Sequence, residues 1–141
     1  MASKVARIPV EDPQAPDLSA VVSSGLRLRS FEELYFVAGH GDLDADFRVR
    51  HPGDPLAQTR AVFDDITGML AEAGYDLDDV VTAEVTVTRE FDLARNIEAL
   101  HRIWAEVFAD VAVKLAAGQL RVADALAVPG MLVEIELLTA R

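Results

Sequence analysis

The chain of 141 residues has the length of one folded domain, and its 51% hydrophobic and 26% charged residues are typical of a globular protein. Its formal net charge of −11 disfavours binding to nucleic-acid phosphates or to anionic lipid. The absence of cysteine excludes disulfides, thiolate metal sites and a cysteine nucleophile.

The first 20 residues are predicted to form an extended arm, because Pro9, Pro13 and Pro16 lie among mixed charges without any period. A partly disordered tail fits the same pattern. This segment lacks the apolar stretch of a signal peptide, and no apolar run approaches the roughly 20 residues that cross a bilayer. We therefore expect a cytoplasmic protein with no membrane partner, in which residues 21–141 form a single domain.

Two strands and a helix are predicted in the first half of that domain. The segment Val21–Arg29 alternates in polarity, and Leu34–Gly39 is a short apolar run suited to a buried strand. After an acidic loop, Asp54 is placed to cap a helix and Pro55 to occupy its first position. Apolar residues then recur at spacings of three and four until Gly74, where the helix is expected to stop.

The second half is predicted to hold three strands and one helix. Period-two alternation over Asp79–Thr88 indicates a half-buried strand. A second helix begins near Asp92 or Asn96, and Gly118 is a plausible stop, although the end can lie several residues earlier. Two closing strands, residues 119–128 and 131–139, are expected to form a tight hairpin across a Pro-Gly turn.

The predicted order is β-β-α-β-α-β-β, an α+β fold with one mixed sheet and both helices on one face. The helices cover only one face of such a sheet, so we expect another copy of the chain to bury the other face.

Four segments, taken in order, resemble the Rid family of YjgF-like reactive-intermediate deaminases: Phe36–Gly39, Ala57–Arg60, Leu77–Val81 and Val133–Glu136. The resemblance implies a chorismate-mutase-like fold, a homotrimer and a site in each cleft between neighbouring subunits. It also implies hydrolysis of enamines and imines such as 2-aminoacrylate to a 2-keto acid and ammonia, with no metal or organic cofactor.

Members of the family hold the substrate carboxylate with an arginine, and a gap-free alignment places Leu120 at that position. Hairpin geometry gives another answer, because a two-residue turn would set Arg121 opposite Leu138 and on the same face as Glu134 and Glu136. Leu120 would then point to the side packed under the helices. We therefore predict that Arg121 binds the substrate carboxylate, while a strand arginine paired with Glu136 remains the alternative.

The resemblance implies three further contributions to the site. The family's last-strand glutamate corresponds to Glu134, a catalytic residue that would position the attacking water; a solvated strand glutamate is the alternative. His101 takes the place of a family asparagine that lines the cleft, and His101 is therefore a second catalytic candidate. The alternative is a core histidine whose hydrogen bonds are satisfied within the protein. Gly39 and His40 are expected to bind substrate from the loop after the second strand. A tyrosine of the family is replaced by Val22.

The altered arginine segment and Val22 leave two other functions open: a different reaction on a small carbonyl or unsaturated acid, or a trimer that binds a small ligand without turning it over. A metal site is not expected. Asp42, Asp44 and Asp46 imitate the start of a calcium loop, but Phe47 stands where that loop needs glycine, and the histidines lack zinc spacing.

Overall fold

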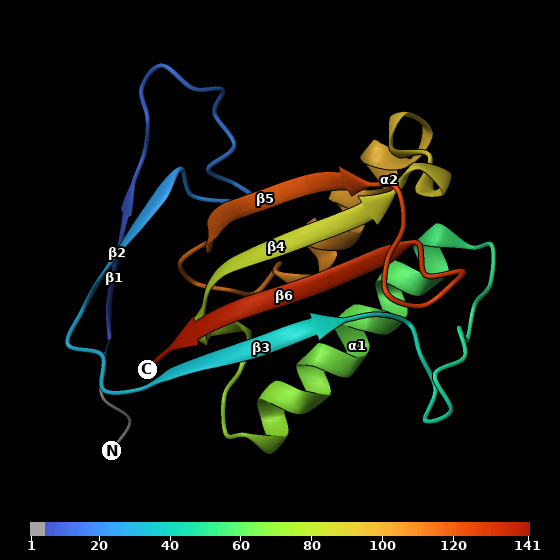
Figure 1. The fold of residues 1–141 in the computed structure, drawn as a ribbon. Coiled ribbons are helices and arrows are strands. Elements are labelled where there is room, and N and C mark those ends of the chain that lie inside the picture. Colours follow the sequence, from blue (N-terminus) through green and yellow to red (C-terminus); the bar gives the residue numbers. More distant parts are fainter. Residues whose placement is uncertain (1–4) are drawn as a thin grey trace.

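The computed structural model describes residues 5–141 and has a mixed sheet with both helices on one face (Figure 1). In chain order the elements are β1 (Ala6–Val10), β2 (Gly25–Arg29), β3 (Leu34–His40), α1 (Pro55–Glu72), β4 (Val80–Thr88), α2 (Leu93–Val107), β5 (Ala116–Ala123) and β6 (Val133–Ala140). From β2 onward this is the predicted order. The segment expected to be an extended arm contains β1, a paired strand that the sequence did not lead us to expect.

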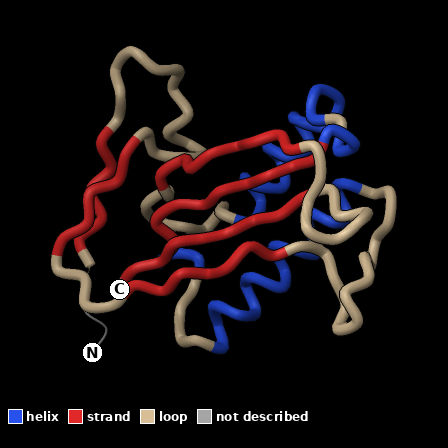
Figure 2. The backbone as a smooth tube through the Cα atoms, viewed as in Figure 1, coloured by secondary structure: helices blue, strands red, loops and turns tan. Residues whose placement is uncertain are grey.

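The strands form two sheets, so the expectation of a single shared sheet is wrong. The main sheet has the order β3-β6-β4-β5, and β5 is parallel to β4 while the other neighbours are antiparallel. β1 and β2 pair only with each other and stand at the end of the main sheet where β3 begins and β6 ends (Figures 1 and 2). Between β2 and β3 the chain turns at Ser30, whose φ of 61° breaks the extended conformation.

The predicted start and end of α1 are confirmed. The Asp54 side chain accepts a hydrogen bond from the backbone N–H of Ala57 at 2.9 Å, Pro55 occupies the first turn, and Gly74 adopts a φ of 80°. For α2, Asp92 is confirmed as the start and Asn96, the alternative start, lies inside the helix, because the Asp92 side chain caps it.

Gly118 does not end α2, because the helix stops at Val107 and Gly118 lies in β5. Phe108, Val111 and Leu115 are buried at helical spacing, but they belong to the connection that returns the chain to the sheet. Their periodicity therefore reflects burial against the core and does not continue the helix.

The predicted closing hairpin is wrong, because β4 lies between β5 and β6 (Figure 1). The turn itself exists: the N–H of Met131 donates to the carbonyl of Val128 at 3.1 Å, and Gly130 has a φ of 89°. However, β5 follows α2 in a parallel crossover from β4, so Arg121 lies beside Thr86 and not opposite Leu138. The half-buried, period-two strand β4 is thus the central partner of both closing strands.

Packing between the helices and the sheet forms the core. Its buried side chains include Val62, Ile66 and Leu70 of α1, Leu100 and Ile103 of α2, and Val85, Val87, Val133 and Ile135 of the sheet. The other side of the main sheet, here called the open face, carries Phe36, Thr82, Glu84, Thr86, Arg121, Glu134, Glu136 and Leu138. No helix within residues 5–141 has the length and apolar character needed to cross a bilayer.

Candidate functional site

A bulge in β5 decides which side chains face each side of the main sheet. Ala83 of β4 pairs with residue 117 and Val85 pairs with Leu120, so between these pairs one residue of β4 is matched by two of β5. Gly118 permits the close approach, because a Cβ there would stand 1.9 Å from the carbonyl oxygen of Ala83. The bulge therefore depends on a residue without a side chain.

After the bulge, neighbouring residues of β5 point to opposite sides of the sheet. Leu120 pairs with core-facing Val85 and points toward α2, whereas Arg121 pairs with Thr86 on the open face. Arg121 thus shares a face with Glu134 and Glu136, and Leu120 lies on the helix side. That division agrees with the predicted one, although it arises from pairing with β4 and not from a hairpin.

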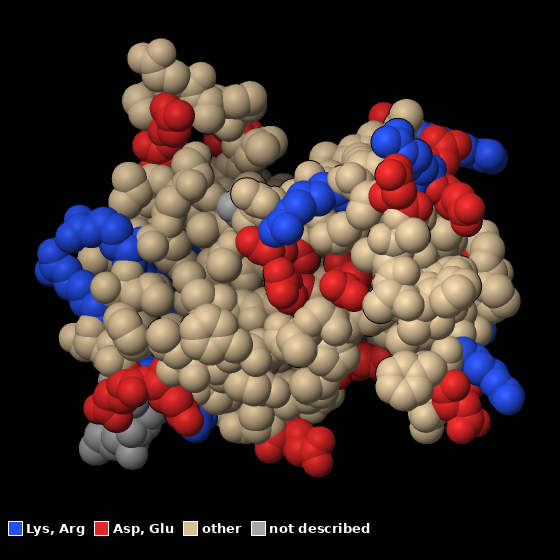
Figure 3. All heavy atoms as spheres, in the orientation of Figure 1, with Lys and Arg blue, Asp and Glu red and all other residues tan. Residues whose placement is uncertain are grey.

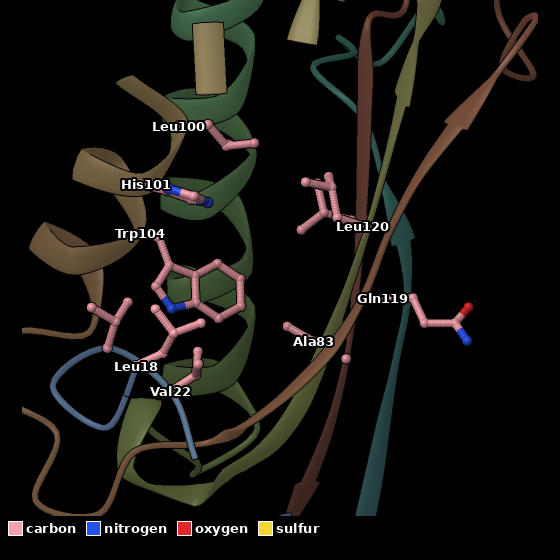
Figure 4. Close-up of a pocket in the computed structure, with 11 residues that line it drawn as sticks. Leu18, Val22, Ala83, Leu100, His101, Trp104, Gln119 and Leu120 are labelled. Carbon is pink, nitrogen blue, oxygen red and sulfur yellow. The ribbon is translucent and has the colours of Figure 1, made fainter. Parts of the chain in front are cut away.

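The helix side holds a pocket of about 260 Å³ between α2 and β5, here called the α2–β5 pocket (Figure 4). Leu100, His101 and Trp104 line it from α2, and residues of β4 and β5, Leu120 among them, line it from the sheet. Leu18, Val21 and Val22, from the segment before β2, also line it. The Gln119 side chain points away from the pocket, so the lining is almost wholly apolar (Figure 4).

The open face, by contrast, carries a cluster of charges. Nη2 of Arg121 lies 2.5 Å from Oε2 of Glu84, which faces Glu136 across β4 and β6. The pKa of Glu136 is raised, chiefly by a hydrogen bond with Glu84 and further by partial desolvation, and nearby Arg121 opposes this rise. Figure 3 shows basic and acidic side chains meeting in the middle of this face.

Glu134 lies on the same face, close to the end of β3. A Cβ on Gly39 would stand 2.6 Å from Oε1 of Glu134, so the carboxylate rests against the glycine backbone. Both Arg121 and Glu134 pair with Thr86 from opposite sides, which separates their backbones by about 10 Å, two strand spacings. A small molecule over Thr86 would therefore be within reach of both side chains.

The structure brings three of the predicted site residues together and separates the others. Gly39, Arg121 and Glu134 belong to the open face, and His40 ends β3 with Nδ1 at 2.6 Å from the carbonyl oxygen of Ala38. His101 lies on the opposite side of the sheet, exposed and in the lining of the α2–β5 pocket. Within one chain, His101 and Glu134 therefore do not face the same space.

Two residues of the pocket were not chosen as candidates from the sequence. Leu120 was the residue that gap-free alignment placed at the family's arginine, and Trp104 follows His101 by three positions, nearly one helical turn. Val22, which stands where the family has a tyrosine, lines the same pocket. The positions of all three residues are visible in the sequence, but a carboxylate-binding site requires a basic side chain, and this requirement favoured Arg121.

The acidic loop that imitates a calcium site has a structural role. The fully buried carboxylate of Asp42 accepts hydrogen bonds from Nε of Arg50 at 2.8 Å and from the backbone N–H of His51 at 2.8 Å. Oδ2 of Asp42, which accepts from the His51 backbone, is also 2.9 Å from Nδ1 of His51. Asp42 thus holds the loop closed, and within residues 5–141 no group of three or more candidate metal ligands is found.

Comparison with known proteins agrees with this architecture. The sequence profile of the family described as Endoribonuclease L-PSP matches residues 14–141. A Yersinia pestis protein of unknown function, the Rid family protein YyfB, superposes with a TM-score of 0.83 at 23% identity, covering 96% of this chain and 98% of that one.

Two other solved structures are similar. A second Rid family protein of Yersinia pestis, YyfA, has a TM-score of 0.65 at 23% identity and covers 96% of this chain and 100% of its own. A member of the YjgF/YER057c/UK114 family from Mycobacterium tuberculosis has a TM-score of 0.60 at 29% identity, with the same two coverages. Since the profile matches nearly the whole length, the chain belongs to the Rid family, and its fold is the α+β fold of that family.

Proposed function

We propose that the protein binds a small, mainly apolar ligand in the α2–β5 pocket. The observation that carries the proposal is that Leu120, which a gap-free alignment places at the family's carboxylate-binding arginine, lines this pocket. An apolar lining gains free energy from burying apolar surface and, away from His101, offers a charged group nothing that replaces its hydration.

The nearest basic side chain on β5 does not compensate for Leu120. Arg121 lies on the other side of the sheet and is paired with Glu84 at 2.5 Å. A ligand carboxylate in the α2–β5 pocket would therefore meet no guanidinium from the chain that forms the pocket. This favours an uncharged ligand over the amino-acid-derived imines that the resemblance implies.

Exchanging Leu120 for arginine tests the proposal. Trp104 is the only tryptophan in the chain and lines the pocket, so its fluorescence reports on occupancy. We expect ethylbenzene to bind the wild-type protein and pyruvate to leave its fluorescence unchanged. In Leu120→Arg we expect ethylbenzene affinity to fall at least about 10-fold, because the longer, charged side chain would replace part of the apolar lining, and pyruvate binding to appear.

The matched control is Val122→Arg. Val122 is on the same side of β5, is 52% exposed and does not line the pocket, so this variant should keep the wild-type preference. Tighter binding of pyruvate than of ethylbenzene by the wild-type protein would overturn the proposal.

Hydrolytic deamination on the open face is a second candidate function. It is favoured by the shared position of Arg121, Glu134 and Gly39, in which Arg121 would leave Glu84 to hold a carboxylate and Glu134 would position water. The protein should then accelerate ammonia release from freshly generated 2-aminoacrylate, and Arg121→Ala and Glu134→Gln should each remove the acceleration. A wild-type rate equal to the spontaneous rate would exclude this candidate.

A homotrimer remains part of the proposal. On the open face Phe36 is 71% exposed, an uncovered aromatic side chain of the kind that marks an interface. If the family's clefts between subunits are retained, His101 and Leu120 of one copy would approach Gly39 and Glu134 of the next. Light scattering should then give about three times the 15.3 kDa chain mass, and a monomer would contradict it.

Ribonuclease activity, which the description of the family profile names, is not supported by the charges of this chain. The formal net charge is −11, and the charged cluster of the open face contains one arginine among three glutamates. RNA binding generally depends on basic side chains that contact phosphates.

A further inference from the structure

Trp104 carries a buried hydrogen-bond donor that has no acceptor. Its indole Nε1 is shielded from solvent and makes no hydrogen bond within residues 5–141. Buried donors are nearly always paired in folded proteins, so an unpaired one in a side chain that lines a pocket indicates a place for a ligand acceptor. The nitrogen lies on the edge of the ring toward Leu18 and Val22, which line the same pocket (Figure 4).

The orientation of this donor is fixed by aromatic packing. The Trp104 ring contacts Phe108 at 4.9 Å between centroids, and Phe63 meets it edge-on at 6.2 Å. These contacts hold the indole in one rotamer, so it cannot turn outward to find water. By contrast, Leu18, at the nitrogen edge, is 56% exposed and can move aside for a ligand oxygen.

The size of the pocket sets the size of the ligand. An apolar protein cavity of about 150 Å³ is large enough to bind benzene. At about 260 Å³, the α2–β5 pocket has room for an aromatic ring with a short substituent.

The lining also sets the charge of the ligand. Among the lining residues there is no Asp, Glu, Lys or Arg, and His101 is the one titratable group. His101 is exposed, so it lies where the pocket meets solvent. A charged ligand group buried deeper would lose its hydration without gaining a partner.

Building on the proposed function, we propose that the α2–β5 pocket takes an uncharged aromatic carbonyl compound, whose oxygen accepts a hydrogen bond from the indole N–H of Trp104. The ring would lie between α2 and the sheet, in contact with the indole and with Leu120 (Figure 4). The carbonyl oxygen would enter the corner next to Leu18 and Val22. Trp104 acts here as a specificity-determining residue, because it distinguishes a carbonyl compound from a hydrocarbon of the same shape.

Three probes of nearly equal size test the proposal: acetophenone, ethylbenzene and benzoate. The chain has one tryptophan, so a ¹⁵N-labelled sample gives a single indole N–H resonance that belongs to Trp104. Acetophenone should move this resonance downfield and bind about 5 to 10 times more tightly than ethylbenzene, the factor expected for one neutral hydrogen bond. Ethylbenzene should bind without the downfield shift, and benzoate should not bind.

The substitution Trp104→Phe keeps an aromatic ring and removes the donor. In this variant acetophenone should lose its advantage and bind as ethylbenzene does, while the affinity for ethylbenzene changes little. The resonance experiment uses the wild-type protein, so the proposal remains testable if the variant fails to fold.

The possible results separate this inference from the proposed function. If ethylbenzene binds but acetophenone binds no better and leaves the indole resonance in place, the inference is overturned and the proposed function stands. If benzoate binds most tightly, or if none of the three binds, both are overturned. Equal affinity for acetophenone and cyclohexyl methyl ketone would overturn the preference for an aromatic ring.

Discussion

The two sides of the main sheet at β5 differ in polarity, although adjacent residues of the same strand line them. On the helix side, Leu120 faces Trp104 across an apolar pocket. On the open face, Arg121 pairs with Glu84 at 2.5 Å, next to Glu136. One step along the strand thus separates an apolar environment from a charged one.

This difference shows that the chemistry available on each side depends on backbone geometry as well as on residue type. Because side chains alternate along a strand, a single extra residue in β5 exchanges the two faces for every residue after it. The bulge at Gly118 therefore determines that a leucine, and not an arginine, enters the α2–β5 pocket.

The largest expected effect on stability comes from replacing Gly118, the glycine that permits the bulge in β5. In Gly118→Ala the new Cβ would meet the carbonyl oxygen of Ala83 at 1.9 Å, and this backbone atom cannot move without disturbing β4. We expect a loss of about 3 kcal/mol in the free energy of unfolding, at the upper end for overpacked sites. Urea unfolding monitored by circular dichroism measures it.

Gly68→Ala is the matched control for this substitution. Gly68 lies in α1, and a methyl group added there would have no neighbouring atom within 4 Å, so the same change should raise stability by up to about 1 kcal/mol through helix propensity. Equal stability of the Gly118→Ala protein and the wild type would show that β5 can form without the bulge.

Gly39→Ala tests the open face with the same chemical change and a smaller expected effect. Its Cβ would come within 2.6 Å of Oε1 of Glu134, the mobile end of a side chain and not a backbone atom. The carboxylate can swing away, so the free energy of unfolding should change by less than about 1 kcal/mol. Any ammonia-releasing activity should fall because Glu134 is displaced, whereas binding of ethylbenzene in the α2–β5 pocket should not change.

Local features of the fold could be predicted from the sequence, and long-range pairing could not. The cap at Asp54 and the stop at Gly74 depend on residues within one turn of the helix, so their chemistry is visible in the sequence. The neighbours of β5 depend on β4, which lies more than 30 residues earlier, and the short Pro-Gly turn wrongly favoured a hairpin. Pro9 similarly obscured β1, although proline is tolerated in an edge strand.

The candidate site was predictable where it depends on the alternation of side chains between the two faces of a strand. The division between Leu120 and Arg121 follows from period two and was predicted. Gly118 was interpreted as a helix stop, although glycine in a strand also marks bulges, and the choice between these depends on where α2 ends. The unpaired indole N–H of Trp104 is a property of packing, which no sequence pattern reveals.

The smallest expected effect concerns the protonation of Glu136 on the open face. A hydrogen bond with Glu84 raises the pKa of Glu136, so the folded protein holds this proton more tightly than the unfolded chain does. The resulting stabilisation is present below the ordinary carboxyl pKa and is lost as the pH rises through the raised pKa. In Glu136→Gln a neutral donor replaces the proton at every pH, so the variant should be more stable than the wild type at pH 7, by less than about 1 kcal/mol because the group is exposed.

This advantage of Glu136→Gln should shrink as the pH is lowered from 7 toward about 4, where the wild-type glutamate regains its proton. Urea unfolding at both pH values measures the difference, and Glu98→Gln, an exposed substitution on α2 outside the cluster, serves as control. If the two variants respond alike, Arg121 outweighs the repulsion between the two glutamates, and the open face is better described as a neutralised ion pair than as a proton-sharing cluster. In that case the charged side of the sheet would be poorly suited to release Arg121 for a ligand carboxylate, and the α2–β5 pocket would remain as the binding site.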